Sequence, residues 1–195
     1  FAATNLAPGA NFHGRLVASN AIALTAGADF IFTTGEKVHV TGGLGLPALR
    51  IPAGLSNAVA VAVGVQGAFA LKANGALIAW GSGTETNVPA GLTNMTAVAC
   101  SYQHGLALRS NGTVVAWGQN LTGQAVPPAN LSNVIAITTG NSNSFALRAD
   151  GRVVAWGQDV AGETLIPPDL NHVVAIAAGA HHVVALQHDG TVRSW

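Results

Sequence analysis

A tryptophan recurs along the chain at a nearly fixed interval. Its four positions are spaced by 37, 39 and 39 residues: Trp80, Trp117, Trp156 and Trp195. A glycine, a proline and a leucine keep the same interval: Gly75, Gly112, Gly151 and Gly190; Pro52, Pro89, Pro128 and Pro167; Leu55, Leu92, Leu131 and Leu170. Self-similarity at a fixed period of roughly 20 to 50 residues is typical of solenoids, propellers and other arrays. The chain is therefore predicted to fold as copies of one small unit.

The unit at residues 133–170 shows the structure expected of each copy. Three short runs, 134–137, 144–148 and 152–156, are rich in β-branched and apolar residues and are separated by turn residues, so they are predicted to be strands. Asp-Gly at 150–151 lies between the second and third runs, and Asn-Gly or Asp-Gly recurs there in the other units. We expect two-residue type I′ hairpin turns, in which both residues have positive φ. No segment free of Gly and Pro shows a helical period, so no helix is expected.

The first run of a unit is apolar on both faces, as in residues 58–63, where Ala and Val alternate. Both faces of such a strand are expected to be covered. Sheets are covered on both sides by copies of themselves when blades pack face to face around an axis, as in a propeller. We predict an all-β fold, namely a β-propeller of about five short blades with three or four strands each. It is either closed or an open or partial ring of a larger propeller.

The chain is predicted to be a single repeat domain over residues 1–195. Its clear units are residues 56–92, 93–131, 132–170 and 171–195, and a degenerate unit without the Trp precedes them at 20–55. The last unit reaches its Trp without the loop and proline found in the others, and residues 1–18 weakly match that part. We expect either that residues 1–18 complete this unit and close the ring, or that the chain is an arc completed by other copies or by a longer ring.

Composition excludes several other classes of protein. Charged residues make up only 8% of the chain, against about 25% in typical soluble proteins, while 49% of residues are hydrophobic. Disordered chains are polar and highly charged, and the apolar runs here are far shorter than the ~20 residues that span a bilayer. The 8 basic and 8 acidic residues balance, and no stretch concentrates Lys or Arg as a nucleic-acid surface requires. We expect neither a nucleic-acid partner nor a membrane span.

Histidine and cysteine are the candidate residues for metal binding or catalysis. The only histidine cluster is His181, His182 and His188. Adjacent residues of a strand point to opposite faces, and His188 lies beyond the second run, so no metal site is expected. His182 recurs as a polar residue beside a tight turn, and we expect its ring to bond the backbone. The single cysteine, Cys100, stands at a strand end without an orienting acid, which indicates a buried and inert thiol.

Acidic residues and tryptophans do not form an evident catalytic or sugar-binding pattern. Glu85 and Glu163 are isolated loop residues, whereas a hydrolase generally needs paired carboxylates or an activated nucleophile. The tryptophans could stack on sugars, but their regular position predicts packing between blades, with each indole N–H bonded to a neighbouring carbonyl. We expect no catalytic residue, no metal and no cofactor, and therefore no enzyme.

The repeat resembles the repeats named for the regulator of chromosome condensation. The matching pattern is Ala-Ile-x-x-Gly, then Ala-Leu-x-x-Asp/Asn-Gly-x-Val-x-Ala-Trp-Gly, then Gly-Gln and Pro, clearest at residues 98–128 and 134–168. The short period is most similar to bacterial members, which include secreted propeller-type inhibitors of β-lactamases. The resemblance implies a rigid disc whose loops bind partner proteins, in an extracellular or cell-surface location. Family members usually have seven blades, whereas this chain has room for about five.

Two sets of loops vary between units and are the candidate binding surface. One joins the first and second strands, and the other follows the Trp-Gly. In the similar β-lactamase inhibitors the first set carries aromatic anchors, and only Tyr102 matches this here. We predict a non-catalytic protein-interaction module; the alternatives are a structural subunit that assembles into an oligomer or fibre, and a carbohydrate-binding propeller. The candidate partner-binding residues are Gln66, Tyr102, Gln103, Asn141, Ser142, His181, Gln119 and Asn120.

Overall fold

The computed structural model shows an all-β chain, as predicted. It describes residues 11–14, 17–20, 23–26, 30–33 and 51–195, and the side chains from residue 51 onward. Within these residues the only helix is one turn of 3₁₀ helix, η2 (Thr84–Thr86). Nothing in the described ranges is a helix with the length and apolar character needed to cross a bilayer.

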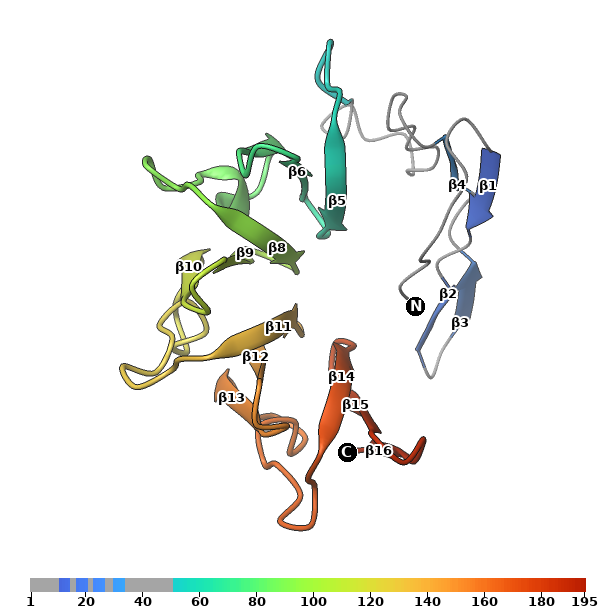
Figure 1. The fold of residues 1–195 in the computed structure, drawn as a ribbon, viewed down its shortest axis with the longest axis vertical. Helices are drawn as coiled ribbons and strands as arrows, with labels where there is room; N and C mark the ends of the chain where they lie inside the picture. The colour runs from blue at the N-terminus through green and yellow to red at the C-terminus, as the bar shows by residue number, and fades with distance from the viewer. Residues whose placement is uncertain (1–10, 15–16, 21–22, 27–29, 34–50) are drawn as a thin grey trace.

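Four three-stranded antiparallel sheets follow one another along the chain, one for each clear repeat, and we call them blades 1 to 4. They consist of β5 (Ala58–Val63), β6 (Gly67–Lys72) and β7 (Leu77–Gly81); β8 (Met95–Cys100), β9 (His104–Arg109) and β10 (Val114–Gly118); β11 (Val134–Thr139), β12 (Asn143–Arg148) and β13 (Val153–Gly157); and β14 (Val173–Ala178), β15 (Val183–Gln187) and β16 (Val192–Ser194). Figure 1 shows the blades fanned around a common centre, with the first strand of each innermost. The described residues thus form a partial β-propeller without a closed sheet.

Four further strands lie in the N-terminal part of the chain. β1 (Asn11–Gly14) pairs with β4 (Phe30–Thr33), and β2 (Val17–Asn20) pairs with β3 (Ala23–Ala26), both antiparallel. Most of the predicted degenerate unit at 20–55, and most of the segment 1–18 predicted to close the ring, lies outside the described residues. The fifth blade and the ring closure therefore stay predictions.

The hairpin between the second and third strands has a different turn class from the predicted one. In blade 1, Gly75 N–H donates to Lys72 C=O at 2.9 Å, and Lys72 N–H donates to Ala76 C=O at 2.8 Å, which closes a three-residue loop. Only the glycine has positive φ, at 78°. This is a type I turn followed by a left-handed glycine, not a two-residue type I′ turn. The Asn side chain acts as an acceptor instead: Asn74 Oδ1 bonds Ala76 N–H at 3.1 Å, and the equivalent bonds are Asn111 to Thr113, Asp150 to Arg152 and Asp189 to Thr191.

Neighbouring blades pack face to face through three buried apolar clusters. Between blades 1 and 2, Phe69 and Leu71 contact Met95 and Trp117. The corresponding residues of the next two interfaces are Leu106, Leu108, Val134 and Trp156, and then Leu147, Val173 and Ala185. Alanines of the first strands line the opposing surfaces, so the sheets approach closely, as the alternating pattern predicted.

The prediction that both faces of the first strand are covered is wrong for β5. Ala60 and Ala62 pack on blade 2, but Val61 and Val63 are 50% and 53% exposed. In β8 and β11 the equivalent positions Val98 and Ile137 are half-buried, because the preceding blade lies against them. Coverage of a first strand therefore comes from its two neighbouring blades rather than from its own sheet.

Candidate functional site: the loop end of the blades

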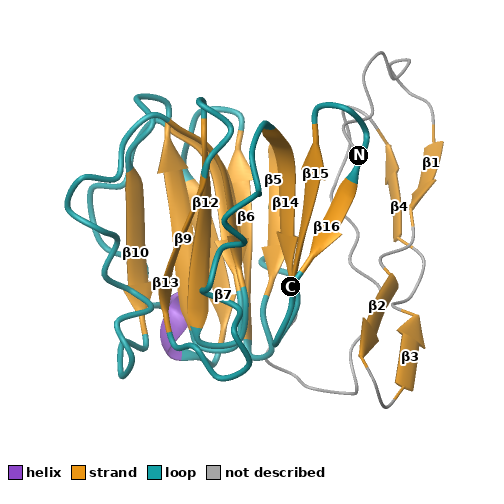
Figure 2. Cartoon of the chain, turned by 90° about the horizontal axis from the view of Figure 1, so that it is seen from below, coloured by secondary structure: helices purple, strands orange, loops and turns teal. Residues whose placement is uncertain are grey.

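The two predicted sets of binding loops meet at one end of the blades. In each blade the first and third strands are both antiparallel to the second, so the loops that follow them emerge at the same end. We call this the loop end, and the opposite end, which carries the hairpin turns, the turn end. Figure 2 shows η2, part of one of these loops, at the lower edge of the strands. Within a blade the loops are joined by backbone bonds of 2.8–2.9 Å: Ser82 to Gln66, Gln119 to Gln103 and Gln158 to Ser142.

Each loop that follows a third strand also reaches the next blade. Thr84 Oγ1 donates to Gln103 C=O at 2.9 Å, across from blade 1 to blade 2. Later blades approach each other at the same place. Thr122 Oγ1, which donates to Gln124 Oε1 at 2.7 Å, lies 3.4 Å from Ser142 C=O, and Glu163 Oε1 lies 3.0 Å from His181 Nδ1. These bonds tie the loops into one rim, so its exposed side chains project from a fixed backbone.

The predicted partner-binding residues lie on this rim but differ in exposure. Tyr102, Asn120 and His181 are exposed, and the other five candidates are half-buried. Gln103 and Ser142 contribute carbonyls to the bonds between loops, and Asn120 Oδ1 accepts the N–H of Ala125 within its own loop at 3.0 Å. Tyr102 is the member of the set that combines a large apolar surface with exposure.

Apolar residues lie at the tips of two of the predicted binding loops, although the sequence analysis did not single these residues out. Leu121 and Val160 are 84% and 63% exposed, and they occupy equivalent positions after the Trp-Gly of blades 2 and 3. Val126 and Leu165, five residues further on in each loop, are exposed as well. Aligning the two loops residue by residue would have revealed this pattern. The loop of blade 1 is two residues shorter and has no counterpart to these tips.

Trp117, Trp156 and Trp195 pack between blades, as predicted. Trp117 and Trp156 are buried, and the indole N–H of Trp156 donates to the carbonyl of Gln124 at 2.9 Å. Trp195 donates to Glu163 C=O in the same way at 2.8 Å, and Trp117 to Glu85 C=O. The rings of Trp117 and Trp156 are therefore not free to stack on a sugar. The equivalent acceptor for Trp80 would be residue 48, which lies outside the described ranges.

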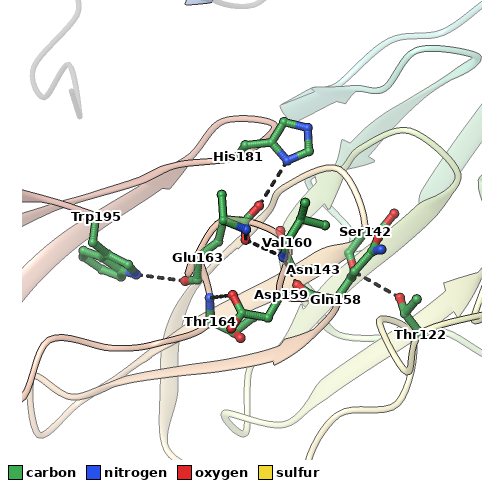
Figure 3. Close-up of polar contacts among 11 residues, drawn as sticks. Thr122, Ser142, Asn143, Gln158, Asp159, Val160, Glu163, Thr164, His181 and Trp195 are labelled. Atoms are coloured by element: carbon green, nitrogen blue, oxygen red, sulfur yellow. Dashed lines mark hydrogen bonds and ion pairs between the residues drawn. The ribbon is translucent and has the colours of Figure 1, made fainter.

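The buried carboxylate of Glu163 holds the loop of blade 3 in place through hydrogen bonds (Figure 3). Its Oε2 accepts the N–H groups of Val160 at 3.0 Å and Ala161 at 2.8 Å, while Oε1 faces His181. Burial raises the pKa of this carboxyl, but the hydrogen bonds from Ala161, His181 and Val160 outweigh it and lower the pKa to about 2. Glu163 is therefore ionised at neutral pH, and it holds the exposed Val160 in place.

Glu85 has the same position in blade 1 but lacks these partners. It is fully buried, and neither carboxylate oxygen has a hydrogen-bond partner among the described residues. Burial raises its pKa. In blade 2 the equivalent residue is Gln124, whose Oε1 accepts the N–H and the hydroxyl of Thr122 at 2.9 and 2.7 Å. The sequence analysis did not relate these three positions to one another, although the Gly-Gln pair at 123–124 and the Gly-Glu pair at 162–163 align Gln124 with Glu163.

His104 joins two blades through hydroxyl groups. Its Nδ1 lies 2.9 Å from Ser101 Oγ, and its Nε2 lies 2.9 Å from Ser144 Oγ in the next blade. Because Ser144 donates its own proton to Gln124 C=O at 2.9 Å, Nε2 must carry the imidazole proton. Burial lowers the pKa of His104 to about 4, so the ring is neutral.

The expected backbone bond of this recurring polar position is found only in blade 3. There Asn143 Nδ2 donates to Gln158 C=O at 3.1 Å. His182 is exposed, its ring lies against Gly179, and the ring forms no hydrogen bond with the backbone of any residue that the structure describes. The residue at this position, which is His104, Asn143 or His182, thus differs in its hydrogen bonding between blades 2, 3 and 4.

Residues 95–124 and 134–163 match the family described as Regulator of chromosome condensation (RCC1) repeat. These two segments are RCC1-type repeats. No curated protein sequence matches it. Solved structures under 25% identical share its fold: Prp20p from Saccharomyces cerevisiae, at 23% identity and a TM-score of 0.61, and the ectodomain of the receptor kinase CR4 from Physcomitrella patens, at 24% and 0.64.

These matches cover 70% and 74% of this chain but only 43% and 42% of the other two, so the chain spans less than half the length of either. Human WBSCR16 aligns over 94% of this chain and 59% of its own, at 19% identity and a TM-score of 0.61. The likeness shows the fold, an array of RCC1-type blades.

Among the residues that the structure describes, no group of three His, Cys, Asp or Glu side chains is placed to hold a metal ion. Cys100 lies at the interface of blades 1 and 2, with Sγ 3.9 Å from Gly67 C=O. Burial, and then the nearby Glu85 charge, raise the pKa of the thiol to about 12. The thiol stays protonated at neutral pH, as an inert cysteine does.

Proposed function

We propose that this RCC1-repeat chain is a non-catalytic module that binds a partner protein through the loop end of its blades. The observation that carries the proposal is the exposure of Tyr102, Leu121 and Val160 on loops that hydrogen bonds hold in place. Protein interfaces depend on a few large side chains that become buried. Fully burying a Leu or Val is worth roughly 1.5–3 kcal/mol, and a fixed backbone lowers the entropy lost on binding.

The loop end is favoured over the turn end because it differs from blade to blade. The turn end repeats the same three-residue hairpin with an Asn or Asp acceptor in all four blades. The tips of these hairpins consist of glycines and short polar residues and are nearly the same in every blade. The loops of the loop end differ in length and sequence, as binding loops on a rigid scaffold do.

Proteins of the same fold support a binding role. The structure of Prp20p from yeast is reported together with its binding to Gsp1p and histones, and another structure shows Kap60 bound to the same yeast protein. Partner recognition by such a blade array supports the binding role proposed for this chain.

An extracellular or cell-surface location is part of the proposal. It rests on the resemblance of the short repeat to secreted bacterial propellers. Immunodetection of the protein in medium, surface and interior fractions of the host cell would test it. Recovery from the interior alone would contradict it.

The binding proposal is tested by capture with matched variants. Immobilised wild-type protein, the triple variant Y102S/L121S/V160S and the control I135S are exposed to a host extract. Ile135 is an exposed apolar residue near the turn end, so I135S removes the same kind of surface elsewhere. We expect proteins that are retained by wild type and I135S and lost from the triple variant. Equal retention by all three, with native circular dichroism, would refute the loop end as the binding surface.

A second candidate function is self-assembly through the side of blade 4. Leu186 is 38% exposed, whereas the next blade buries the equivalent Leu71, Leu108 and Leu147 to 4% or less. A further blade, including one from another copy, would cover Leu186 in the same way. Sedimentation velocity of wild type and L186E tests this. A wild-type protein that remains monomeric at high concentration would exclude it.

A further inference from the structure

Charged side chains of the described residues are divided between the two ends of the blades. All five Lys and Arg residues between 51 and 195 lie toward the turn end. Lys72, Arg109 and Arg148 are the last residues of the second strands of blades 1 to 3. Arg152 and Arg193 come one and three residues after the hairpin glycines of blades 3 and 4. None of the described loops at the loop end carries a Lys or Arg.

Acidic residues are found at both ends, but only at the turn end do cations accompany them. There Asp150 lies 3.5 Å from Arg148, and Asp169 lies 2.6 Å from Arg193. The loop end has three acidic residues, Glu85, Asp159 and Glu163, of which Asp159 is exposed. Its histidines are the neutral His104 and the exposed pair His181 and His182, of which His181 faces Glu163.

Acidic and apolar groups are adjacent in the loop of blade 3 (Figure 3). Asp159 directly precedes the exposed Val160, and its Oδ1 accepts the N–H of Thr164 at 3.2 Å, which fixes the carboxylate beside the tip. The buried carboxylate of Glu163 accepts a hydrogen bond from the N–H of Val160. An apolar side chain therefore projects from a locally negative surface. Among the described residues, no Lys or Arg lies at this end to balance these carboxylates.

We infer that the loop end binds a partner segment in which Lys or Arg accompanies large apolar side chains, docked over the long loops 119–126 and 158–165. The apolar residues of the segment would bury Leu121 and Val160, and its cation would lie near Asp159. Exposed charges add little affinity but select the partner and speed the encounter, so the apolar contacts supply the binding and the charges the specificity. This inference rests on the proposed function of the loop end.

The probe is an unbiased phage-displayed library of 12-residue peptides, selected against the immobilised chain. Selected peptides are then measured by fluorescence anisotropy against wild type, L121S/V160S, D159N and the control I135S. Asn at 159 keeps the oxygen that accepts the Thr164 N–H and removes only the charge. We expect peptides rich in Lys or Arg that contain at least one large apolar residue. Their affinity should fall at least tenfold with L121S/V160S, two- to fivefold with D159N, and remain unchanged with I135S.

The outcomes separate this inference from the proposed function. Two outcomes would overturn the charge inference but leave the loop end as a binding surface. In the first, the peptides that lose affinity with L121S/V160S are neutral or acidic. In the second, their affinity changes neither with D159N nor with a rise from 50 to 500 mM NaCl. The proposed function and the charge inference would both be overturned by peptides whose affinity is unchanged by L121S/V160S, or by a library that yields no peptide bound at the loop end. Basic peptides whose binding persists in L121S/V160S would indicate charge attraction alone and also count against the inference.

Discussion

Trp156 donates its indole N–H to the backbone carbonyl of Gln124, which lies 32 residues earlier in the preceding blade, at 2.9 Å. Trp195 and Glu163 repeat the relation at 2.8 Å with the same separation. The bond connects the end of one blade's third strand to the loop that leads out of the previous one. The residue that marks the repeat in the sequence thus also sets the distance between blades and anchors the binding loops.

Replacing Trp156 with Phe should destabilise the chain by roughly 1–2 kcal/mol, because a buried hydrogen bond and part of the ring packing are lost. The loss stays moderate since Gln124 C=O keeps the bond from Ser144 Oγ. Urea unfolding of W156F, S144A and the double variant measures it. The double variant should lose more than the sum of the two single variants, because Gln124 C=O is then buried without a donor. Strict additivity would show that the shared acceptor does not matter.

His104 should make stability depend on pH in mildly acidic solution. Its pKa falls from 6.5 to about 4 in the folded chain, so below pH 6.5 the unfolded chain binds a proton that the folded chain does not. Its contribution to folding is complete above pH 6.5 and is lost as pH falls from 6.5 to 4, by up to roughly 3 kcal/mol.

The variant H104N isolates this effect, since Asn stands at the same position in blade 3. We expect a lower free energy of unfolding at pH 7.5 and a flatter decline between pH 6.5 and 4. Chemical denaturation at a series of pH values measures both. A variant with the wild-type slope would mean that other groups cause the decline.

Glu163 and Glu85 should respond to pH in opposite directions. The lowered pKa of Glu163 means that its contribution is present above pH 4.5 and is lost as pH falls toward 2. The raised pKa of Glu85 means that the fold is favoured while this carboxyl is protonated, and that stability declines as pH rises through its folded pKa.

Gln at these two positions tests the contrast. E85Q should raise the unfolding free energy at pH 8 by roughly 1–2 kcal/mol, because no buried charge is then left without a partner, and should have less effect at pH 4. E163Q should lower stability at pH 7, with a deficit that shrinks as pH falls below 4.5. Equal effects of the two substitutions at pH 8 would contradict the difference in their surroundings.

Much of the blade could be read from the sequence, because its determinants are local. Alternating Val and Ala, the Asn-Gly or Asp-Gly pairs and the recurring Trp specify three strands, a hairpin and a packing residue within about 38 residues. The predicted bond from the Trp indole N–H to a neighbouring carbonyl was confirmed for Trp117, Trp156 and Trp195, since a buried N–H needs an acceptor.

The turn class and the binding surface were harder to read. A type I turn with a left-handed glycine and a type I′ turn share the same residue pairs, and the choice depends on how the Asn side chain is bonded. Leu121 and Val160 were not singled out within their predicted binding loops, because the sequence does not show in which direction a loop residue points. Glu85 and Glu163 looked unrelated because the two-residue deletion hides their equivalence.

Two glycines with the same backbone conformation should differ in their tolerance of a side chain. Gly75 and Gly123 have φ values of 78° and 84°, so alanine is strained at either by roughly 1 kcal/mol. A Cβ at Gly75 would lie 3.2 Å from the backbone of Asn94 at the start of the next blade, whereas a Cβ at Gly123 would meet nothing within 4 Å. G75A should therefore lose more stability than G123A, measured by urea unfolding. Gly75 lies where blades 1 and 2 meet at the turn end. If G75A lost no more unfolding free energy than G123A, the backbone of Asn94 would have to move away from the added Cβ without destabilising the chain.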